Sequence, residues 1–164
     1  MTDNLASPDI QAIAAGLAKA WLFLSGSERL FIPTMDHATT VSFSEFSYFM
    51  PLQFAEPHRT GGIGVLVDPA DARAVATHMF GLPVEALASA DLHDACAEVC
   101  NLFSDSIAMH IGGNADVQIG LPFLADLPVY SAITLASTVI ALYAGASQEA
   151  TTLVVVYHPF SQPN

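Results

Sequence analysis

The chain has 164 residues, of which 52% are hydrophobic and 12% charged, and these values predict one globular domain, residues 1–164, with a core of its own. Sixteen acidic residues against four basic ones give a formal charge of −12, which argues against nucleic-acid binding and against anionic membrane surfaces. A partner that brings positive charge or a metal ion is favoured instead.

The first predicted helix begins at Ser7-Pro8-Asp9, because proline is favoured at the first helical position. Ser25-Gly26-Ser27 is expected to end it. Between these points apolar residues recur at helical spacing: Ile10, Ile13, Ala14, Leu17 and Trp21. Residues 1–10 lack the basic and apolar regions of a signal peptide, so a cytoplasmic protein is expected.

The next segment carries strand signals. Residues 39–54 are rich in aromatic and β-branched residues and predict one or two strands. A turn is expected at residues 57–62, followed by a short buried strand at residues 64–67. Gly61 and Gly62 are interpreted as turn residues and as a place of close backbone packing.

Two helices are predicted in the middle of the chain. Asp68-Pro69 gives the first a capping carboxylate and a proline at its first position, and Gly81 ends it. Ser89 is placed to cap the second, which runs to about Ile111 and stops at Gly112-Gly113.

The last third predicts strands at residues 117–123, 137–143 and 151–157, the last two forming a hairpin across residues 145–149. Residues 127–148 are free of charge and are interpreted as buried strands. A membrane segment is disfavoured because serine and threonine dilute the run and no Lys or Arg flanks it. The expected fold is α+β, a mainly antiparallel sheet packed with about three helices.

The predicted helix at residues 89–111 has two contrasting faces. One is an apolar stripe expected to be buried: Leu92, Ala95, Cys96, Val99, Phe103 and Ile107. The opposite stripe is acidic and follows the spacing 3, 4, 3, 4: Asp91, Asp94, Glu98, Asn101 and Asp105. Like charges one turn apart repel each other. The stripe therefore either receives a cation from outside or reflects an acidic protein with a solvated face.

Glu98 and Asn101 form the chemically specific pair within this stripe. Three residues apart on a helix, their side chains project next to each other. A carboxylate can hold an ammonium group from a partner, and a neutral amide offers both a donor and an acceptor to a water molecule. The spacing alone is weak evidence for a site.

Residues 61–123 resemble the CheX/CheC/FliY chemotaxis phosphatases. The resemblance rests on a short strand (GGIGVLVD), a helix that ends in glycine (PADARAVATHMFG), a helix with an E-x-x-N signature (DACAEVCN), and a strand that ends in Leu121-Pro122. The first helix and the last strands fit this family more loosely.

The resemblance implies that the E-x-x-N helix docks on a phosphorylated CheY-like response regulator. Asn101 would then orient the attacking water, and Glu98 would pair with a lysine of the regulator. Asp94 and Asp105 are expected to contact the same partner. No cofactor of its own is implied, since the Mg²⁺ belongs to the regulator's receiver domain. One motif per chain is the CheX-like arrangement, which implies a homodimer with one site per subunit.

The family pattern is broken at Asp105, where relatives carry glycine or another small residue four positions after the asparagine. A carboxylate there would repel phosphate or hinder close approach. One alternative is therefore a catalytically silent module that binds a receiver domain or a flagellar-switch partner. Another is a structural oligomerisation domain with a solvated acidic face.

His93, Cys96 and Cys100 follow the spacing i, i+3, i+7 along one helix, and all three are residue types that bind zinc. Cys96 falls in the apolar stripe, and three ligands from one helix are unusual. Reduced, buried structural cysteines are favoured, so no metal is expected.

Overall fold

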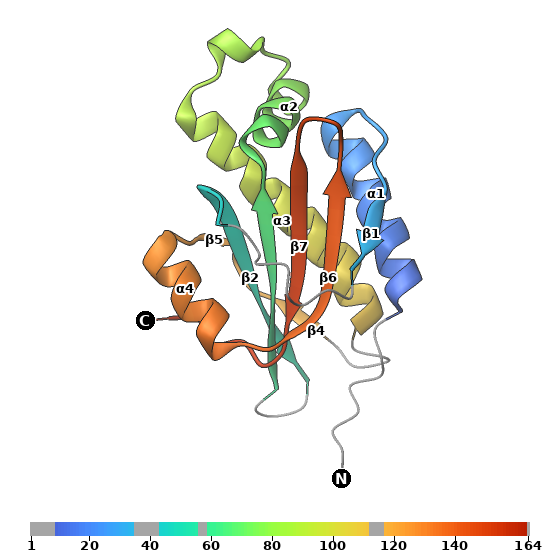
Figure 1. Ribbon diagram of the computed structural model, residues 1–164, viewed down its shortest axis with the longest axis vertical. Coiled ribbons are helices and arrows are strands. Elements are labelled where there is room, and N and C mark those ends of the chain that lie inside the picture. Colours follow the sequence, from blue (N-terminus) through green and yellow to red (C-terminus); the bar gives the residue numbers. More distant parts are fainter. Residues whose placement is uncertain (1–8, 35–42, 56–58, 112–116, 164) are drawn as a thin grey trace.

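The computed structural model describes residues 9–34, 43–55, 59–111 and 117–163. They form an antiparallel sheet in the order β1-β6-β7-β3-β2-β4, with β5 also paired to β2 (Figure 1). Its strands are β1 (Phe31–Pro33), β2 (Phe46–Phe54), β3 (Thr60–Val67), β4 (Val117–Ile119), β5 (Phe123–Leu124), β6 (Val139–Ala146) and β7 (Thr151–Tyr157). The helices are α1 (Ile10–Ser25), α2 (Pro69–Phe80), α3 (Ser89–Ile111) and α4 (Leu127–Ala136), with a short 3-10 turn η1 (Val84–Ala86). The predicted α+β class and antiparallel sheet are confirmed.

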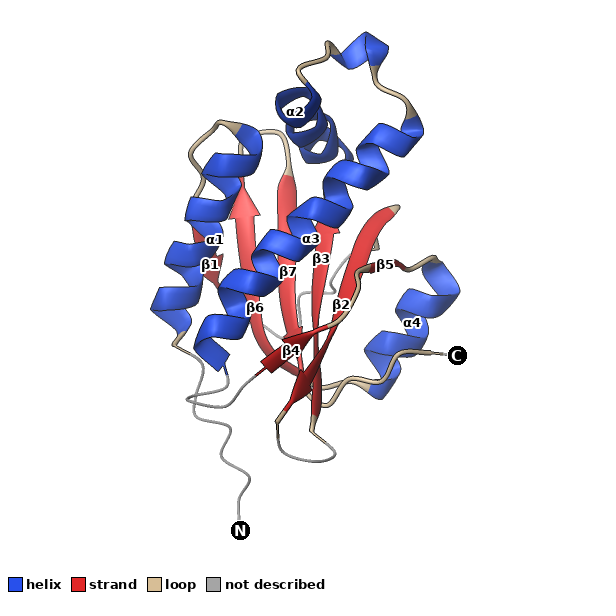
Figure 2. Cartoon of the chain, turned by 180° about the vertical axis from the view of Figure 1, so that it is seen from behind, coloured by secondary structure: helices blue, strands red, loops and turns tan. Residues whose placement is uncertain are grey.

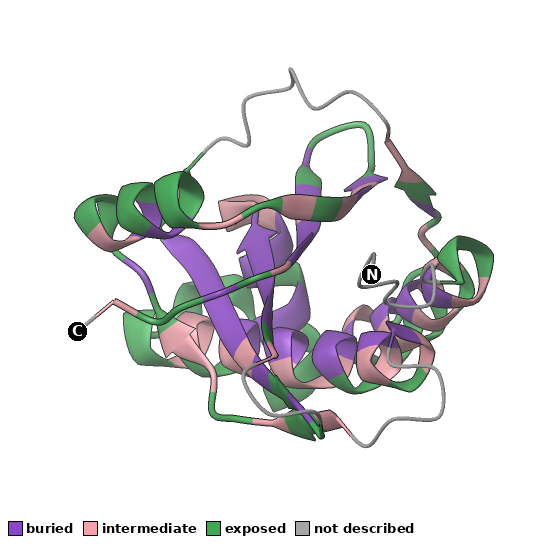
Figure 3. Ribbon diagram, turned by 90° about the horizontal axis from the view of Figure 1, so that it is seen from below, coloured by how far each residue is buried: buried purple, intermediate pink, exposed green. Residues whose placement is uncertain are grey.

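The helices cover the two faces of the sheet unequally. Helices α1 and α3 lie on one face, with α3 running diagonally across the strands, and α2 lies at the end of the sheet against both helices (Figure 2). The larger core lies here, where Trp21, Leu17 and Phe103 from the helices meet Met50 and Val65 from the sheet. Helix α4 lies on the other face over a smaller, aromatic-rich core (Figure 3). The central strands β2, β3 and β7 are therefore buried on both faces, since successive side chains of a strand point to opposite faces.

Helix α4 corrects the prediction of buried strands at residues 127–148. Only β6, the second part of that segment, is a strand. Asp126 caps α4 by accepting a hydrogen bond from the Val129 N–H at 3.1 Å, and Pro128 lies in the first turn. Tyr130 and Ile133 are its buried residues. The structure thus has four α-helices in its described part, where about three were expected.

Two smaller boundaries also differ from the prediction. Helix α1 begins at Ile10, and Asp9 caps it by accepting from the Ala12 N–H at 3.0 Å. Residues 1–8, including the proposed Pro8 start, lie outside the described residues, as do residues 39–42 and 112–116. The single strand predicted at residues 117–123 is divided into β4 and β5. Both pair with β2 on either side of Pro51, which has no N–H to continue the ladder.

Strand β3 begins at Thr60, so the predicted turn at residues 57–62 is wrong for residues 60–62, while residues 57 and 58 lie outside the described residues. The expected close packing is confirmed. A Cβ on Gly62 would collide with the Phe160 ring, and a Cβ on Gly64 would lie 2.8 Å from the Phe49 ring. The two glycines therefore make room for the aromatic core under α4.

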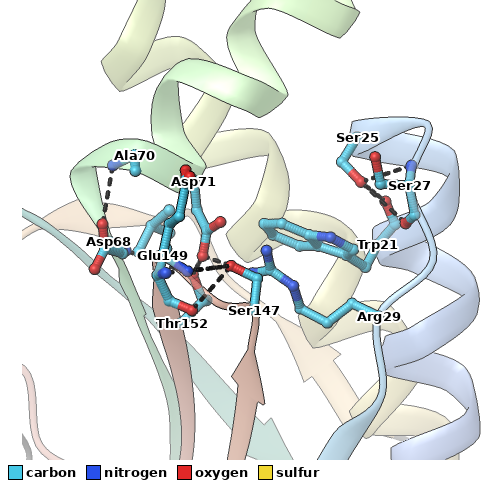
Figure 4. A network of polar contacts seen from close by, with 12 residues as sticks. Trp21, Ser25, Ser27, Arg29, Asp68, Ala70, Asp71, Ser147, Glu149 and Thr152 are labelled. Atoms are coloured by element: carbon cyan, nitrogen blue, oxygen red, sulfur yellow. Dashed lines mark hydrogen bonds and ion pairs between the residues drawn. The ribbon is translucent and has the colours of Figure 1, made fainter.

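A buried polar network joins three segments at the end of the sheet near α2 (Figure 4). Arg29, in the connection from α1 to β1, pairs with Asp71 of α2 at 2.6 Å and lies over the Trp21 ring at 4.5 Å. The Thr152 hydroxyl of β7 donates to the same Asp71 oxygen at 2.7 Å. The network fixes α2 against both α1 and the sheet.

Within the described ranges, no helix is long and apolar enough to cross a membrane.

Candidate functional site

The candidate site lies on α3, whose first turn is fixed by a carboxylate. Asp91 accepts a hydrogen bond from the Ala88 N–H at 2.8 Å. Ser89 is the first helical residue, so its predicted role as the cap is wrong, and Asp91 satisfies the free backbone donor instead. Asp91 therefore stabilises the start of α3, and it is the one member of the acidic stripe that caps the helix.

The inner face of α3 packs into the core as predicted. Cys96, Val99, Phe103 and Ile107 are completely buried, while Leu92 is only partly buried. This apolar face orients the helix, because turning it would expose these side chains and bury carboxylates. The opposite stripe is thereby directed away from the sheet.

On the outer face, the members of the stripe differ in exposure. Asp94 and Asp105 are exposed, and between them Glu98 and Asn101 are half-buried. The Asn101 Nδ2 donates to the Glu98 Oε2 at 3.3 Å, as the i, i+3 spacing predicts. That distance is at the long end for an N–H···O hydrogen bond. The carboxylate and the amide therefore hold each other side by side while both remain open to a partner or a water molecule.

Helix α3 itself contains no Lys or Arg. The buried ion pair of Arg29 with Asp71 lies away from the outer face of α3. Asp94, Glu98 and Asp105 thus form a row of negative charge, one or two turns apart, without a salt bridge inside the described chain. This arrangement attracts a positively charged group from another molecule.

The thiols beside this stripe belong to the core. Burial raises the pKa of both Cys96 and Cys100 to about 12, so each is protonated at neutral pH. A zinc ligand or a nucleophile must be a thiolate. His93, the third residue of this i, i+3, i+7 set, has its Nδ1 2.8 Å from the Tyr48 hydroxyl and its ring against Phe46. These three residues therefore have structural partners. Among the residues that the structure describes, no group of three or more His, Cys, Asp or Glu is arranged to hold a metal ion.

Sequence reasoning missed a groove beside the pair. An open groove of about 470 Å³ lies between helices α1 and α3, and Lys19, Phe23, Leu102, Asp105 and Met109 help to line it. The two helices approach closely at Gly16, where a Cβ would lie 3.2 Å from the Cβ of Ser106. Small residues at these two positions allow the close approach, but the sequence alone does not show that they face each other.

Comparison with solved structures identifies the architecture. One similar chain is from the CheX-CheY-BeF3-Mg²⁺ complex of Borrelia burgdorferi, at a TM-score of 0.69 and 12% identity over 94% of this chain and 99% of that one. CheX from Desulfovibrio desulfuricans matches with a TM-score of 0.64 and 15% identity over 90% and 97% of the two chains. The chain has the CheX/CheC fold.

The CheX/CheC fold is shared more widely. The FliM middle domain of Helicobacter pylori matches with a TM-score of 0.57 and 11% identity, over 97% of this chain and 93% of that one. No family model and no curated protein sequence matches the chain. At these identities the likeness concerns the fold, and the chemistry has to be argued from the residues on α3.

Proposed function

We propose that this protein is an aspartyl-phosphate phosphatase that acts on the receiver domain of a CheY-like response regulator. The observation that carries the proposal is the Glu98–Asn101 pair, half-buried on the outer face of α3 between two exposed carboxylates. The CheX/CheC fold supports it, because one chain of that fold has been crystallised in a complex with CheY, BeF3 and Mg²⁺. The sequence resemblance points to the same two residues.

The chemistry requires little from this chain. Water attacks the phosphorus, the bond from phosphorus to the aspartyl oxygen breaks, and the products are inorganic phosphate and the free carboxylate. The receiver supplies the Mg²⁺ that neutralises the phosphoryl oxygens, so this chain needs no metal. The Asn101 amide would orient the water for in-line attack, and positioning of this kind accounts for a large share of such catalysis.

Glu98 would act as a docking group rather than as a base. A lysine of the receiver can replace the Asn101 amide as its partner, because the present hydrogen bond is long, at 3.3 Å. That exchange would release the Nδ2 of Asn101 for the water molecule. Asp94 and Asp105, exposed on either side, would contact the same partner and add long-range attraction.

The proposal includes a homodimer with one site on each chain and a place in the cytoplasm with the regulator. A second candidate, a silent module that binds a receiver without turnover, is favoured by one observation. Asp105 is exposed one turn after Asn101 and brings a negative charge toward the incoming phosphoryl group.

The test is the decay of phosphoaspartate in CheY-like receiver domains of the same cell, with and without this protein. The wild type should accelerate the decay. Asn101→Ala should lower kcat by about 10²–10³, the usual effect of removing a positioned donor, while the affinity for the receiver stays almost unchanged. Binding of the receiver by the wild type without any acceleration of the decay would instead favour the silent module, and decay as fast with Asn101→Ala as with wild type would remove the catalytic role of Asn101.

Glu98→Ala is the matched variant, since it removes the neighbouring side chain of the same pair. It should weaken both affinity and rate, by roughly 2 kcal/mol because Glu98 is only half-buried. Added salt should reproduce part of the Glu98 defect by screening the charge, and should not reproduce the defect of the neutral amide.

A further inference from the structure

The groove between α1 and α3 continues the candidate site along the same helix. The acidic stripe follows the spacing 3, 4, 3, 4 as far as Asp105, and one more step of four residues arrives at Met109. Met109 and Asp105 line the groove together with Leu102, which follows Asn101 directly. The reactive pair and the groove are therefore parts of one surface.

Two large apolar side chains project into solvent at this groove. Phe23 of α1 and Met109 of α3 are each 76% exposed, and both line the groove. Single exposed apolar residues are ordinary, but two that line the same groove of about 470 Å³ form a contact surface. Aromatic residues are typical anchors of protein interfaces, and methionine adapts its shape to a partner.

We infer that this groove is the docking surface for the receiver domain, which inserts an apolar side chain between Phe23 and Met109. The inference rests on the proposed function, since its occupant is the receiver whose phosphoaspartate faces Asn101. A partner placed on Glu98 and Asn101 meets the groove within one or two helical turns.

The charges at the groove fit a partner surface of mixed sign. Lys19 on α1 and Asp105 on α3 both line it, so one carboxylate and one ammonium group flank the apolar contact. A charged rim around an apolar centre is the usual anatomy of a protein interface. Lys19 also places positive charge in the same groove as Asp105, which offsets the repulsion that Asp105 exerts on phosphate.

The test measures binding and turnover separately, with purified CheY-like receiver domains of the same cell loaded with Mg²⁺ and beryllium fluoride. Phe23→Ser and Met109→Ser should each raise the dissociation constant about tenfold or more, and raise KM for the phosphorylated receiver with little change in kcat. Because both side chains are exposed, these variants should keep the thermal midpoint of the wild type.

Leu135→Ser is the matched control. Leu135 is 88% exposed on α4, on the opposite face of the sheet, and its substitution should leave receiver binding unchanged. Asn101→Ala should bind as wild type without turnover, which separates this inference from the proposed function.

Three results would overturn the inference. If the Phe23 and Met109 variants bind and react as wild type while Asn101→Ala loses turnover, the proposed function stands and the groove is not the docking surface. If no receiver binds the wild type, the named occupant is wrong and the proposed function fails as well. If Met109→Ser instead dissociates a self-associated form in sedimentation, the groove holds a second copy of this chain.

Discussion

Glu98 and Asn101 owe their position to residues that have no part in the proposed chemistry. The completely buried side chains of Cys96, Val99 and Phe103 fix the rotation of α3, and this rotation places the pair on the outer face. Because the pair is three residues apart, its internal hydrogen bond needs no support from another element. For this reason the pair could be predicted from sequence, and its geometry agrees with that prediction.

Asp105 is the residue at which the proposed activity is most open to test. Asp105→Ala removes a carboxylate one turn from Asn101, and it should leave kcat for receiver dephosphorylation unchanged or raise it by about two- to fivefold. Two charges roughly 7 Å apart in water interact by about 0.6 kcal/mol, and the phosphoryl group carries more than one charge. Initial rates at saturating receiver give the answer.

Asp94→Ala is the control for this variant, because it removes an equally exposed carboxylate from the other end of the stripe. It should weaken affinity slightly without raising kcat. A slower Asp105→Ala enzyme would show that the carboxylate contributes a contact to the partner that outweighs its repulsion of phosphate.

At the scale of elements, the start of a helix was easier to predict from the sequence than whether an apolar segment forms a helix or a strand. Asp68-Pro69 predicted α2 correctly, and Asp68 indeed accepts from the Ala70 N–H at 2.9 Å. Asp126, Leu127 and Pro128 carry nearly the same signal, yet the absence of charge from residues 127–148 predicts buried strands there. The capping residue predicts a helix, whereas an apolar composition predicts only that the segment is buried and does not decide between helix and strand.

Strand pairing and the groove could not be predicted in this way. β1 is three residues long and depends on β6 for its ladder, with Phe31 opposite Gly145. The contact of α1 with α3 joins residues about ninety positions apart in sequence, as Gly16 and Ser106 show. Long-range packing of this kind leaves almost no local pattern in a single sequence.

The polar network between α1, α2 and β7 sets the stability of that end of the fold. The side chains of Arg29 and Asp71 are only 10% and 4% exposed. Asp71→Ala should lower the free energy of unfolding by about 3–5 kcal/mol, because it leaves the Arg29 guanidinium buried without its partner. The Arg29→Ala, Asp71→Ala double variant should cost less than the sum of the two single changes, by about 0.5–3 kcal/mol. Urea denaturation of the four proteins measures both effects.

Asp68→Ala supplies the comparison for Asp71→Ala, since it removes a nearby carboxylate that only caps α2. It should cost about 1 kcal/mol. Equal losses for the two substitutions would mean that the network contributes no more than an ordinary helix cap.

At the scale of the whole molecule, the charge-poor strands at the end of the chain give no reason for a homodimer. The hairpin of β6 and β7 was confirmed, but these strands are internal: β6 lies between β1 and β7, and β7 lies next to β3. They need no cover from a second chain. What remains is exposed apolar surface at the edge and on α4, chiefly Leu30, Ile32 and Leu135.

Charge decides the conditions under which such a dimer should form. Each chain carries a formal charge of −12, so two copies repel each other, and the repulsion reaches about 30 Å at 0.01 M ionic strength but only about 8 Å at 0.15 M. We therefore expect sedimentation at micromolar concentration to show mainly monomer at the lower ionic strength and mainly dimer at the higher one.

Salt should thus strengthen self-association while it weakens docking through Glu98, because self-association works against like charges and docking depends on opposite charges. A monomer at both ionic strengths would contradict the expected homodimer without touching the roles of Glu98 and Asn101, because both residues of the pair lie on a single chain.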